Sequence, residues 1–184
     1  AKLTPVKADI VVGIPDSGLA AATGFAHQAG INREQGLLKN RYIGRTFIEP
    51  EKIRKSSVEL KFNVIVERVA KKDIILVDDS LVRGNTLKYV IQLLKSYGAK
   101  KIHVRIASPP IKFPDYYGID TPKNNDLIAA QHSTAEIQEI IGADSLEFLD
   151  LTDFIKSTGL PKTRLNLSSF NGEYPIEIPE VVAV

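Results

Sequence analysis

The chain has 184 residues, 43% of them hydrophobic, and a formal net charge of +2 at pH 7. This length and composition allow one domain with a sizeable core, the small charge favours neither nucleic acid nor a membrane surface as a partner, and no apolar run approaches the roughly 20 residues of a membrane span. Because the chain contains no cysteine, disulfides, a thiolate nucleophile and cysteine-ligated zinc or iron–sulfur sites are excluded.

Short apolar runs alternate with segments of helical spacing. In chain order the predicted elements are a strand at residues 9–13, a helix at 17–29, strands at 36–38 and 73–77, a helix at 85–97, a strand at 101–107, a helix at 133–141, a strand at 145–149 and a helix at 151–157. Gly30 and Gly98 end the first two helices, and Ser133 with Glu136 forms a capping box at the third. The alternation predicts an α/β fold, a doubly wound and mostly parallel sheet with helices on both faces.

Two stretches do not follow this alternation. Residues 33–72 contain 11 lysines and arginines against 5 acidic residues, and residues 40–72 form a long polar segment. Long irregular segments in compact domains are usually functional or disordered, and the positive charge favours a flexible flap that attracts an anion. We expect one domain over residues 1–160, with the flap at about 40–72. A C-terminal tail over residues 161–184 is expected to pack on this domain or on a missing partner.

The most informative segment runs from Ile74 to Thr86. Its apolar first part predicts a buried strand that ends in two adjacent carboxylates, Asp78 and Asp79. Ligands of parallel sheets bind at the carboxyl ends of the strands. At that position two carboxylates can accept hydrogen bonds from the vicinal hydroxyls of a sugar and can hold a hard cation.

A loop with small and hydroxyl-bearing residues follows the acid pair and leads directly into a helix. It comprises Ser80, Leu81, Val82, Arg83, Gly84, Asn85 and Thr86. Backbone N–H groups, hydroxyls and a helix N-terminus together bind a phosphate monoester, and a glycine lets the backbone approach it closely. The segment therefore predicts a site for a ribose 5-phosphate. The alternative is a strand-end turn with capping carboxylates, which the joint presence of the acid pair and the phosphate loop disfavours.

Three weaker signals point to further contacts with an anion or a metal. The turn of residues 13–18 can hold an anion and place Ser17 near a metal, although an ordinary strand–helix turn explains it equally well. Residues 39–46 carry three cations, which suits a diphosphate, but a solvated basic loop has the same composition. Lys61 lies in the flap and can close over a substrate, yet by itself it is an ordinary surface lysine.

Together these residues resemble the phosphoribosyltransferase half of the glutamine phosphoribosylpyrophosphate amidotransferases (amidophosphoribosyltransferases), over nearly the whole chain. The acid pair and the phosphate loop are common to type I phosphoribosyltransferases. Lys-Asn-Arg-Tyr-x-Gly-Arg-Thr-Phe at residues 39–47 and Ser-Pro-Pro-Ile at residues 108–111 are more specific. The matching segments are residues 12–17, 39–48, 77–86, 103–111, 117–120, 141–146 and 170–175.

The resemblance implies a role for each matching residue. Asp78 and Asp79 bind the ribose hydroxyls and help to hold Mg²⁺, with Ser17 near the metal, and residues 80–86 bind the 5-phosphate. The residues at the pyrophosphate are Asp16, Ser17, Lys39, Arg41 and Tyr42. Lys61 belongs to the loop that closes over the substrate. The cations expected to assist catalysis are Lys39, Arg41 and Lys61.

The implied reaction is displacement of pyrophosphate from C1 of phosphoribosylpyrophosphate by ammonia. It forms 5-phosphoribosylamine in the first committed step of de novo purine biosynthesis. By analogy with glycoside hydrolysis, positive charge develops on the sugar ring. Catalysis then depends on orientation, neutralisation of the leaving group and exclusion of water. No protein nucleophile is required, in agreement with the absence of cysteine.

Departures from the family pattern bear on cofactors and partners. The family's glutaminase half precedes this region and works through an N-terminal cysteine. We therefore expect no glutamine-dependent activity from this chain alone, and a glutaminase domain or subunit as its partner. Some members hold a structural iron–sulfur cluster, but the matching residues here are Asp115, Asn166 and Ser169, so we expect Mg²⁺ and no cluster. Asn85 replaces the usual threonine of the phosphate loop, which is expected to weaken one contact.

The resemblance also implies a homo-oligomer and purine nucleotides as feedback inhibitors, although such sites can require residues outside this chain. Because the N-terminus lacks a secretory apolar stretch, we expect a cytoplasmic protein. Three alternatives stay open: a nucleobase phosphoribosyltransferase, a non-catalytic regulator that binds phosphoribosylpyrophosphate or nucleotides, and a folded but inactive truncation. The first would need a base-recognition hood and a DNA-binding regulator a basic recognition helix, and neither is evident.

Overall fold

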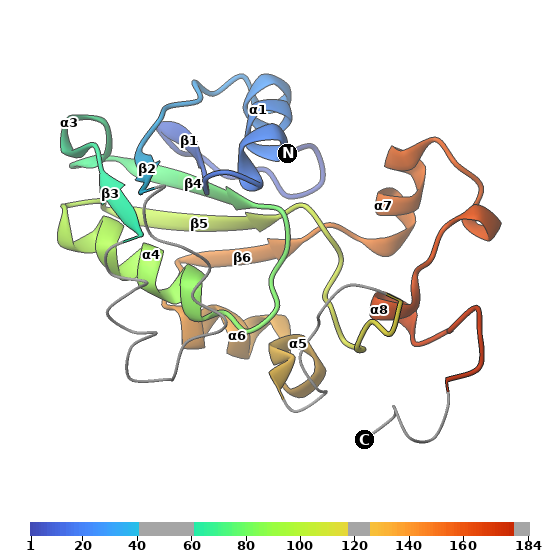
Figure 1. Cartoon of the computed structure of the whole chain (residues 1–184). Coiled ribbons are helices and arrows are strands. Elements are labelled where there is room, and N and C mark those ends of the chain that lie inside the picture. The colour runs from blue at the N-terminus through green and yellow to red at the C-terminus, as the bar shows by residue number, and fades with distance from the viewer. Residues whose placement is uncertain (41–60, 118–125, 179–184) are drawn as a thin grey trace.

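A parallel sheet of four strands, in the order β1-β4-β5-β6, forms the centre of the molecule (Figure 1). The computed structural model describes residues 1–40, 61–117 and 126–178. The strands of the sheet are β1 (Ile10–Gly13), β4 (Asp73–Asp78), β5 (Lys101–Ile106) and β6 (Ser145–Phe148). Residues 74–77 of β4 are all buried, as expected for a parallel strand that is covered on both faces.

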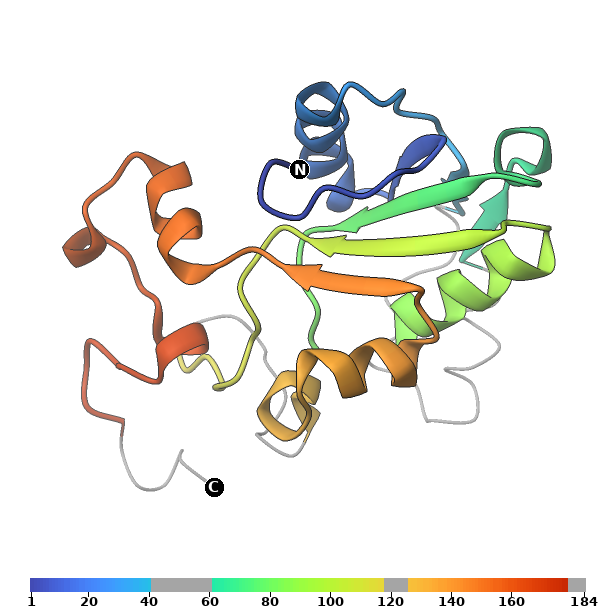
Figure 2. The ribbon, with the colours of Figure 1, turned by 180° about the vertical axis from the view of Figure 1, so that it is seen from behind.

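Helices cover both faces of this sheet, as Figures 1 and 2 show from opposite sides. Helix α1 (Gly18–Ala29) packs on one face, where the small side chains of Ala22 and Ala26 let it lie close to the strands. Helices α4 (Asn85–Ser96) and α6 (Thr134–Ile141) cover the other face and contribute larger aliphatic side chains to the main core. The fold is therefore doubly wound, as the alternation of elements predicts.

Later parts of the chain lie along both edges of β1. After α1, Arg33 forms a parallel bridge with Val11 along the edge of β1 that faces away from β4. On the other side β1 pairs with β4, with Gly13 opposite Val77. In doubly wound sheets the ligand crevice lies where successive connections run to opposite sides. This topology puts that point between β1 and β4.

A small antiparallel ribbon lies between α1 and β4 in the chain. Strand β2 (Leu37–Lys39) pairs with β3 (Phe62–Val64), and the short helix α3 (Val66–Val69) follows. Leu37 and Phe62 are buried in the main core cluster, which fixes the ribbon to the body of the domain.

The remaining helices are short, and the C-terminal ones pack near the loop that follows β5. They are α5 (Ile128–Gln131), α7 (Leu151–Thr158), η3 (Lys162–Arg164) and α8 (Ser168–Asn171). The carbonyl of Ser169 accepts hydrogen bonds from the N–H groups of Lys112 (2.9 Å) and Phe113 (3.1 Å). The Tyr174 hydroxyl donates to the carbonyl of Pro114 at 2.8 Å. These bonds tie the described part of the tail to residues 112–114, while α7 stands apart from the sheet (Figure 2).

The predicted fold class is confirmed, and each predicted strand and helix is present with ends that differ by no more than one residue. The capping box is also confirmed, because the Ser133 N–H donates to the Glu136 carboxylate at 2.7 Å while Ser133 Oγ accepts from the Glu136 N–H at 3.3 Å. None of the described helices has the length and apolar character that crossing a membrane would require.

The last part of the segment predicted as a flap contains regular structure. Strand β3 and helix α3 form within residues 40–72, because Phe62 and Val69 are buried in the core. Residues 41–60, the rest of the predicted flap, lie outside the described residues.

Candidate functional site

Strands β1 and β4 end side by side, so the loops that follow them leave the same edge of the sheet. Their pairing continues one step beyond β1, because the N–H of Ile14 donates to the carbonyl of Val77 at 2.9 Å. The loop of residues 14–17 therefore starts beside Asp78, the last residue of β4. This edge is where a parallel sheet binds its ligands.

Gly18, the first residue of α1, brings that helix against the end of β4. A Cβ atom at this position would lie 2.6 Å from the carbonyl oxygen of Val77 and 3.2 Å from Oδ1 of Asp78. A glycine therefore allows an approach that any side chain would obstruct. The sequence placed Gly18 at the end of the first turn motif but gave no sign of this contact, because it joins segments that are far apart in the chain.

The two carboxylates at the end of β4 lie in different surroundings. Asp78 is partly buried, and its Oδ1 accepts a hydrogen bond from the Asp79 N–H at 3.0 Å. Burial, and after it the hydrogen bond and charge of the Asp79 carboxylate, raise the pKa of Asp78 to about 8. Asp79 is exposed, and the Ser80 hydroxyl donates to it at 3.4 Å. At pH 7 Asp78 is therefore mainly neutral, and a nearby cation would favour its ionised form.

The loop between Asp79 and α4 presents backbone N–H groups at the same edge. The side chain of Leu81 is 3% exposed and anchors the loop in the core, and Gly84, with a φ of +79°, turns the chain into α4. Within the part of the chain that the structure describes, the N–H groups of residues 81–86 donate to no protein acceptor. Unpaired N–H groups at a helix N-terminus form a natural binding site for an anion.

Two lysines on the β2–β3 ribbon add positive charge near the loop of residues 14–17. Lys39 Nζ lies 2.7 Å from Oδ2 of Asp16, and the Asn40 N–H donates to the carbonyl of Lys61 at 2.8 Å across the ribbon. Partial burial, and then the charge of Lys39, lower the pKa of Lys61. Since both partners of the Lys39–Asp16 pair are partly exposed, the pair contributes about 1 kcal/mol or less. An incoming anion can therefore compete with Asp16 for Lys39.

Most residues that the sequence predicts for the site meet at this edge of the sheet. They are Asp16, Ser17, Lys39, Lys61 and residues 78–86. Ser17 is exposed, and its hydroxyl makes no capping hydrogen bond to α1. A ligand would therefore not have to displace such a bond. Arg41 and Tyr42 lie outside the described residues. The edge can thus hold one anion on backbone N–H groups and a second one near the two lysines.

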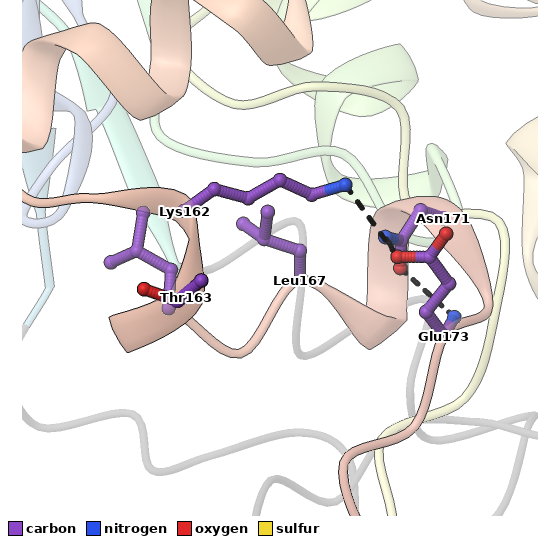
Figure 3. Close-up of a pocket in the computed structure, with 6 residues that line it drawn as sticks. Lys162, Thr163, Leu167, Asn171 and Glu173 are labelled. Atoms are coloured by element: carbon purple, nitrogen blue, oxygen red, sulfur yellow. Dashed lines mark hydrogen bonds and ion pairs between the residues drawn. The ribbon is translucent and has the colours of Figure 1, made fainter.

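A cavity of about 320 Å³ lies elsewhere, in the C-terminal segments (Figure 3). Its lining residues are Lys162, Thr163, Leu165, Leu167, Asn171 and Glu173. The Lys162 ammonium and the Asn171 side-chain amide both approach the Glu173 carboxylate, at 3.6 and 2.8 Å. Since the charged groups at this cavity pair with each other and none of the predicted site residues that the structure describes lines it, we do not assign the chemistry to it.

The chain is similar to known enzymes of purine biosynthesis. Residues 3–121 match the family described as the phosphoribosyl transferase domain. The chain is 47% identical to an amidophosphoribosyltransferase of Staphylococcus aureus (strain MRSA252), over 95% of the chain and 36% of that protein. It is 45% identical to the amidophosphoribosyltransferase of a Synechocystis species, over 99% of the chain and 37% of that protein. It therefore spans little more than a third of the length of these relatives.

Two solved structures have the same fold at 43% sequence identity and a TM-score of 0.86, and they match 97% of this chain and 40% of theirs. One is described as the allosteric regulatory enzyme of purine biosynthesis. The other is glutamine phosphoribosylpyrophosphate amidotransferase from B. subtilis complexed with ADP and GMP. The fold is accordingly that of a type I phosphoribosyltransferase, as the sequence predicts.

The contact at Gly18 gives a first prediction. We expect Gly18→Ala to destabilise the protein and to displace Asp78, because the new Cβ atom meets the backbone of β4. Gly24→Ala is the matched control in the same helix, since a Cβ atom there meets nothing within 4 Å. It should stabilise the protein by up to about 1 kcal/mol through helix propensity. Urea unfolding of both variants measures the difference, and equal stability would contradict the close packing.

The raised pKa of Asp78 gives a second prediction. The folded protein holds this proton more tightly than the unfolded chain, where the pKa is near 3.8. The resulting stabilisation is complete below the unfolded pKa and is lost as the pH rises to about 8. Asp78→Asn has no charge to bury, so we expect its stability relative to the wild type to increase from pH 4 to pH 9. Urea unfolding at each pH tests this. A difference in unfolding free energy between the two proteins that does not change with pH would contradict the raised pKa of Asp78.

Proposed function

The chain belongs to the phosphoribosyl transferase family, and we propose that it transfers the 5-phosphoribosyl group of phosphoribosylpyrophosphate to ammonia, with release of pyrophosphate. The product is 5-phosphoribosylamine, and the step is the first committed one of de novo purine biosynthesis. One observation carries the proposal. The acid pair at the end of β4 lies beside the loop of residues 14–17, which Lys39 contacts, and it is followed by residues 81–86, whose N–H groups have no acceptor among the described residues.

The proposed substrate fits this arrangement group by group. The N–H groups of residues 81–86 and the start of α4 hold the 5-phosphate. The ribose hydroxyls donate hydrogen bonds to the carboxylates of Asp78 and Asp79. The pyrophosphate lies near Asp16, Ser17 and Lys39, with Arg41 and Tyr42 as further expected contacts.

The oxygen atoms of the site fit Mg²⁺. Asp78 and Asp79 offer carboxylates and Ser17 a hydroxyl, and Mg²⁺ is commonly held by one or two carboxylates together with substrate phosphates. The described residues contain no group of three or more histidine, cysteine, aspartate or glutamate side chains that could hold a metal ion. We therefore propose that the substrate supplies the remaining ligands. The bound ion would neutralise part of the pyrophosphate charge and favour the ionised form of Asp78.

Catalysis in this proposal is mainly orientation and charge neutralisation. As the bond between C1 and the pyrophosphate oxygen breaks, negative charge grows on the leaving group and positive charge grows on the ribose ring. Burial and then the charge of Lys39 lower the pKa of Lys61, and a pyrophosphate near the two lysines would favour the charged form of Lys61. Arg41 is the third cation proposed to assist. Ammonia then bonds to C1 and loses a proton, so no protein nucleophile is needed.

The proposed partners of the chain come from its relatives, of which it matches little more than a third. We propose that a glutaminase domain or subunit supplies ammonia from glutamine, because this chain has no cysteine for that chemistry. Purine nucleotides are proposed as regulators, since a similar structure holds ADP and GMP. A homo-oligomer in the cytoplasm, with Mg²⁺ and no iron–sulfur cluster, completes the proposal.

A pyrophosphate-release assay with different acceptors tests this function. We expect release from phosphoribosylpyrophosphate with ammonium at a pH above 8, where more free ammonia is present. Glutamine should support no release with this chain alone. Release with adenine, hypoxanthine or orotate in place of ammonium would instead identify a nucleobase phosphoribosyltransferase. Binding of phosphoribosylpyrophosphate without release under any condition would favour a non-catalytic regulator.

The acid pair gives a direct prediction for substrate binding. Replacing Asp78 and Asp79 together by asparagine should weaken the binding of phosphoribosylpyrophosphate with Mg²⁺ by about 10- to 100-fold, the loss expected for hydrogen bonds that involve charged groups. Calorimetric titration measures the affinity, and Glu139→Gln on the exposed surface of α6 is the control. Excess chelator should abolish turnover of the wild type. Unchanged affinity in the double variant would rule out the proposed role of the acid pair.

A further inference from the structure

We propose that residues 126–128, at the start of α5, hold the phosphate loop in its binding conformation. The inference rests on the proposed function, because it takes residues 80–86 as the site of the 5-phosphate. No feature of the sequence connects these two segments, and their contact is visible only in the fold. Asp126 and Ile128 are therefore positioning residues, which act on the substrate through the loop.

Three consecutive residues of the phosphate loop contact this segment. The carbonyl of Val82 accepts a hydrogen bond from the N–H of Ile128 at 2.9 Å. Arg83 Nη2 lies 3.0 Å from Oδ2 of Asp126. A Cβ atom on Gly84 would lie 3.1 Å from Cδ1 of Ile128, so that side chain packs directly under the turn into α4. Backbone, charge and packing thus all link residues 82–84 to α5.

These contacts matter because the loop has few others. Its N–H groups at residues 81–86 donate to no acceptor in the described part of the chain, so hydrogen bonds from these groups cannot hold the loop in place. Leu81 anchors one end in the core, and α4 begins at the other end. Between these two points the direction of the N–H groups depends on the bond at Val82 and the ion pair at Arg83. A loop that is already in its bound conformation loses less entropy when the ligand arrives.

The charge of Asp126 allows two opposite expectations. If the carboxylate acted only as a negative charge near the phosphate, its removal would strengthen binding. If it holds Arg83, and with it the loop, its removal would weaken binding. The contacts to Val82 and Gly84 on either side of Arg83 favour the second expectation. Since the Asp126 and Arg83 side chains are 55% and 38% exposed, the effect of the ion pair alone should be modest, about two- to fivefold.

The test is calorimetric titration of the full chain with ribose 5-phosphate. We expect Asp126→Asn to weaken binding by about two- to fivefold at low ionic strength, and the loss to shrink as added salt screens the pair. Asp153→Asn is the matched control, because Asp153 also forms an exposed pair, with Lys156 at 3.1 Å on α7. In the ammonium-dependent assay, Asp126→Asn should raise the KM for phosphoribosylpyrophosphate and leave kcat unchanged, since the 5-phosphate is remote from C1.

A double-mutant cycle separates positioning from simple charge. If Asp126 acts through Arg83, then Asp126→Ala should have no further effect on affinity in an Arg83→Ala background. The backbone bond is tested by Ile128→Pro, which removes the N–H at the first position of α5, where proline is tolerated. Ile128→Ala is its control, since it loses the same side chain and keeps the N–H. The proline variant should bind ribose 5-phosphate more weakly than the alanine variant, and circular dichroism checks that both fold.

The possible outcomes are distinct. No binding of ribose 5-phosphate or phosphoribosylpyrophosphate by the wild type would refute the proposed function, and the inference with it. Wild-type binding together with unchanged or tighter binding by Asp126→Asn would overturn the positioning role of Asp126 and leave the proposed function intact. If Ile128→Pro does not fold, the double-mutant cycle decides alone, and additive effects of Asp126→Ala and Arg83→Ala would overturn the inference.

Discussion

The site depends on the parallel pairing of β1 with β4. At this pairing, later parts of the chain lie along both edges of β1. That pairing continues through the bond between Ile14 and Val77, so two loops from distant parts of the chain start next to each other. Gly18 then lets α1 pack against Asp78 without a side chain between them. A slip in the register of these strands would separate the loop of residues 14–17 from the acid pair, and the two proposed anion sites could no longer bind one substrate.

Charge is distributed unevenly around this edge. One carboxyl, Asp78, is partly buried and mainly neutral, whereas its neighbour Asp79 is exposed. Near the loop of residues 14–17, partial burial and then the charge of Lys39 lower the pKa of Lys61. In the proposed function, the substrate and its Mg²⁺ would favour the charged forms of Asp78 and Lys61. The pair of Lys39 with Asp16 neutralises charge within the protein, but both side chains are partly exposed, so an incoming anion can compete for Lys39.

Signals that lie within a short stretch of sequence made much of this predictable. The apolar run of β4, the glycines that end α1 and α4, and the capping box at Ser133 each depend on neighbouring residues. The acid pair and the phosphate loop are likewise contiguous. Strand β3 and helix α3 were missed because a few residues within a basic segment carry too little periodicity. The different surroundings of Asp78 and Asp79, and the pairing of Arg83 with Asp126, depend on tertiary packing, which spacing along the chain does not encode.

The central claim is that the end of β4 and the loop after it hold an activated sugar phosphate. A crystal structure of this chain with phosphoribosylpyrophosphate and Mg²⁺ tests it most directly. The account predicts the 5-phosphate within hydrogen-bonding distance of the N–H groups of residues 81–86, and the ribose hydroxyls at Asp78 and Asp79. A sugar phosphate bound at another surface, with this loop empty, would contradict it.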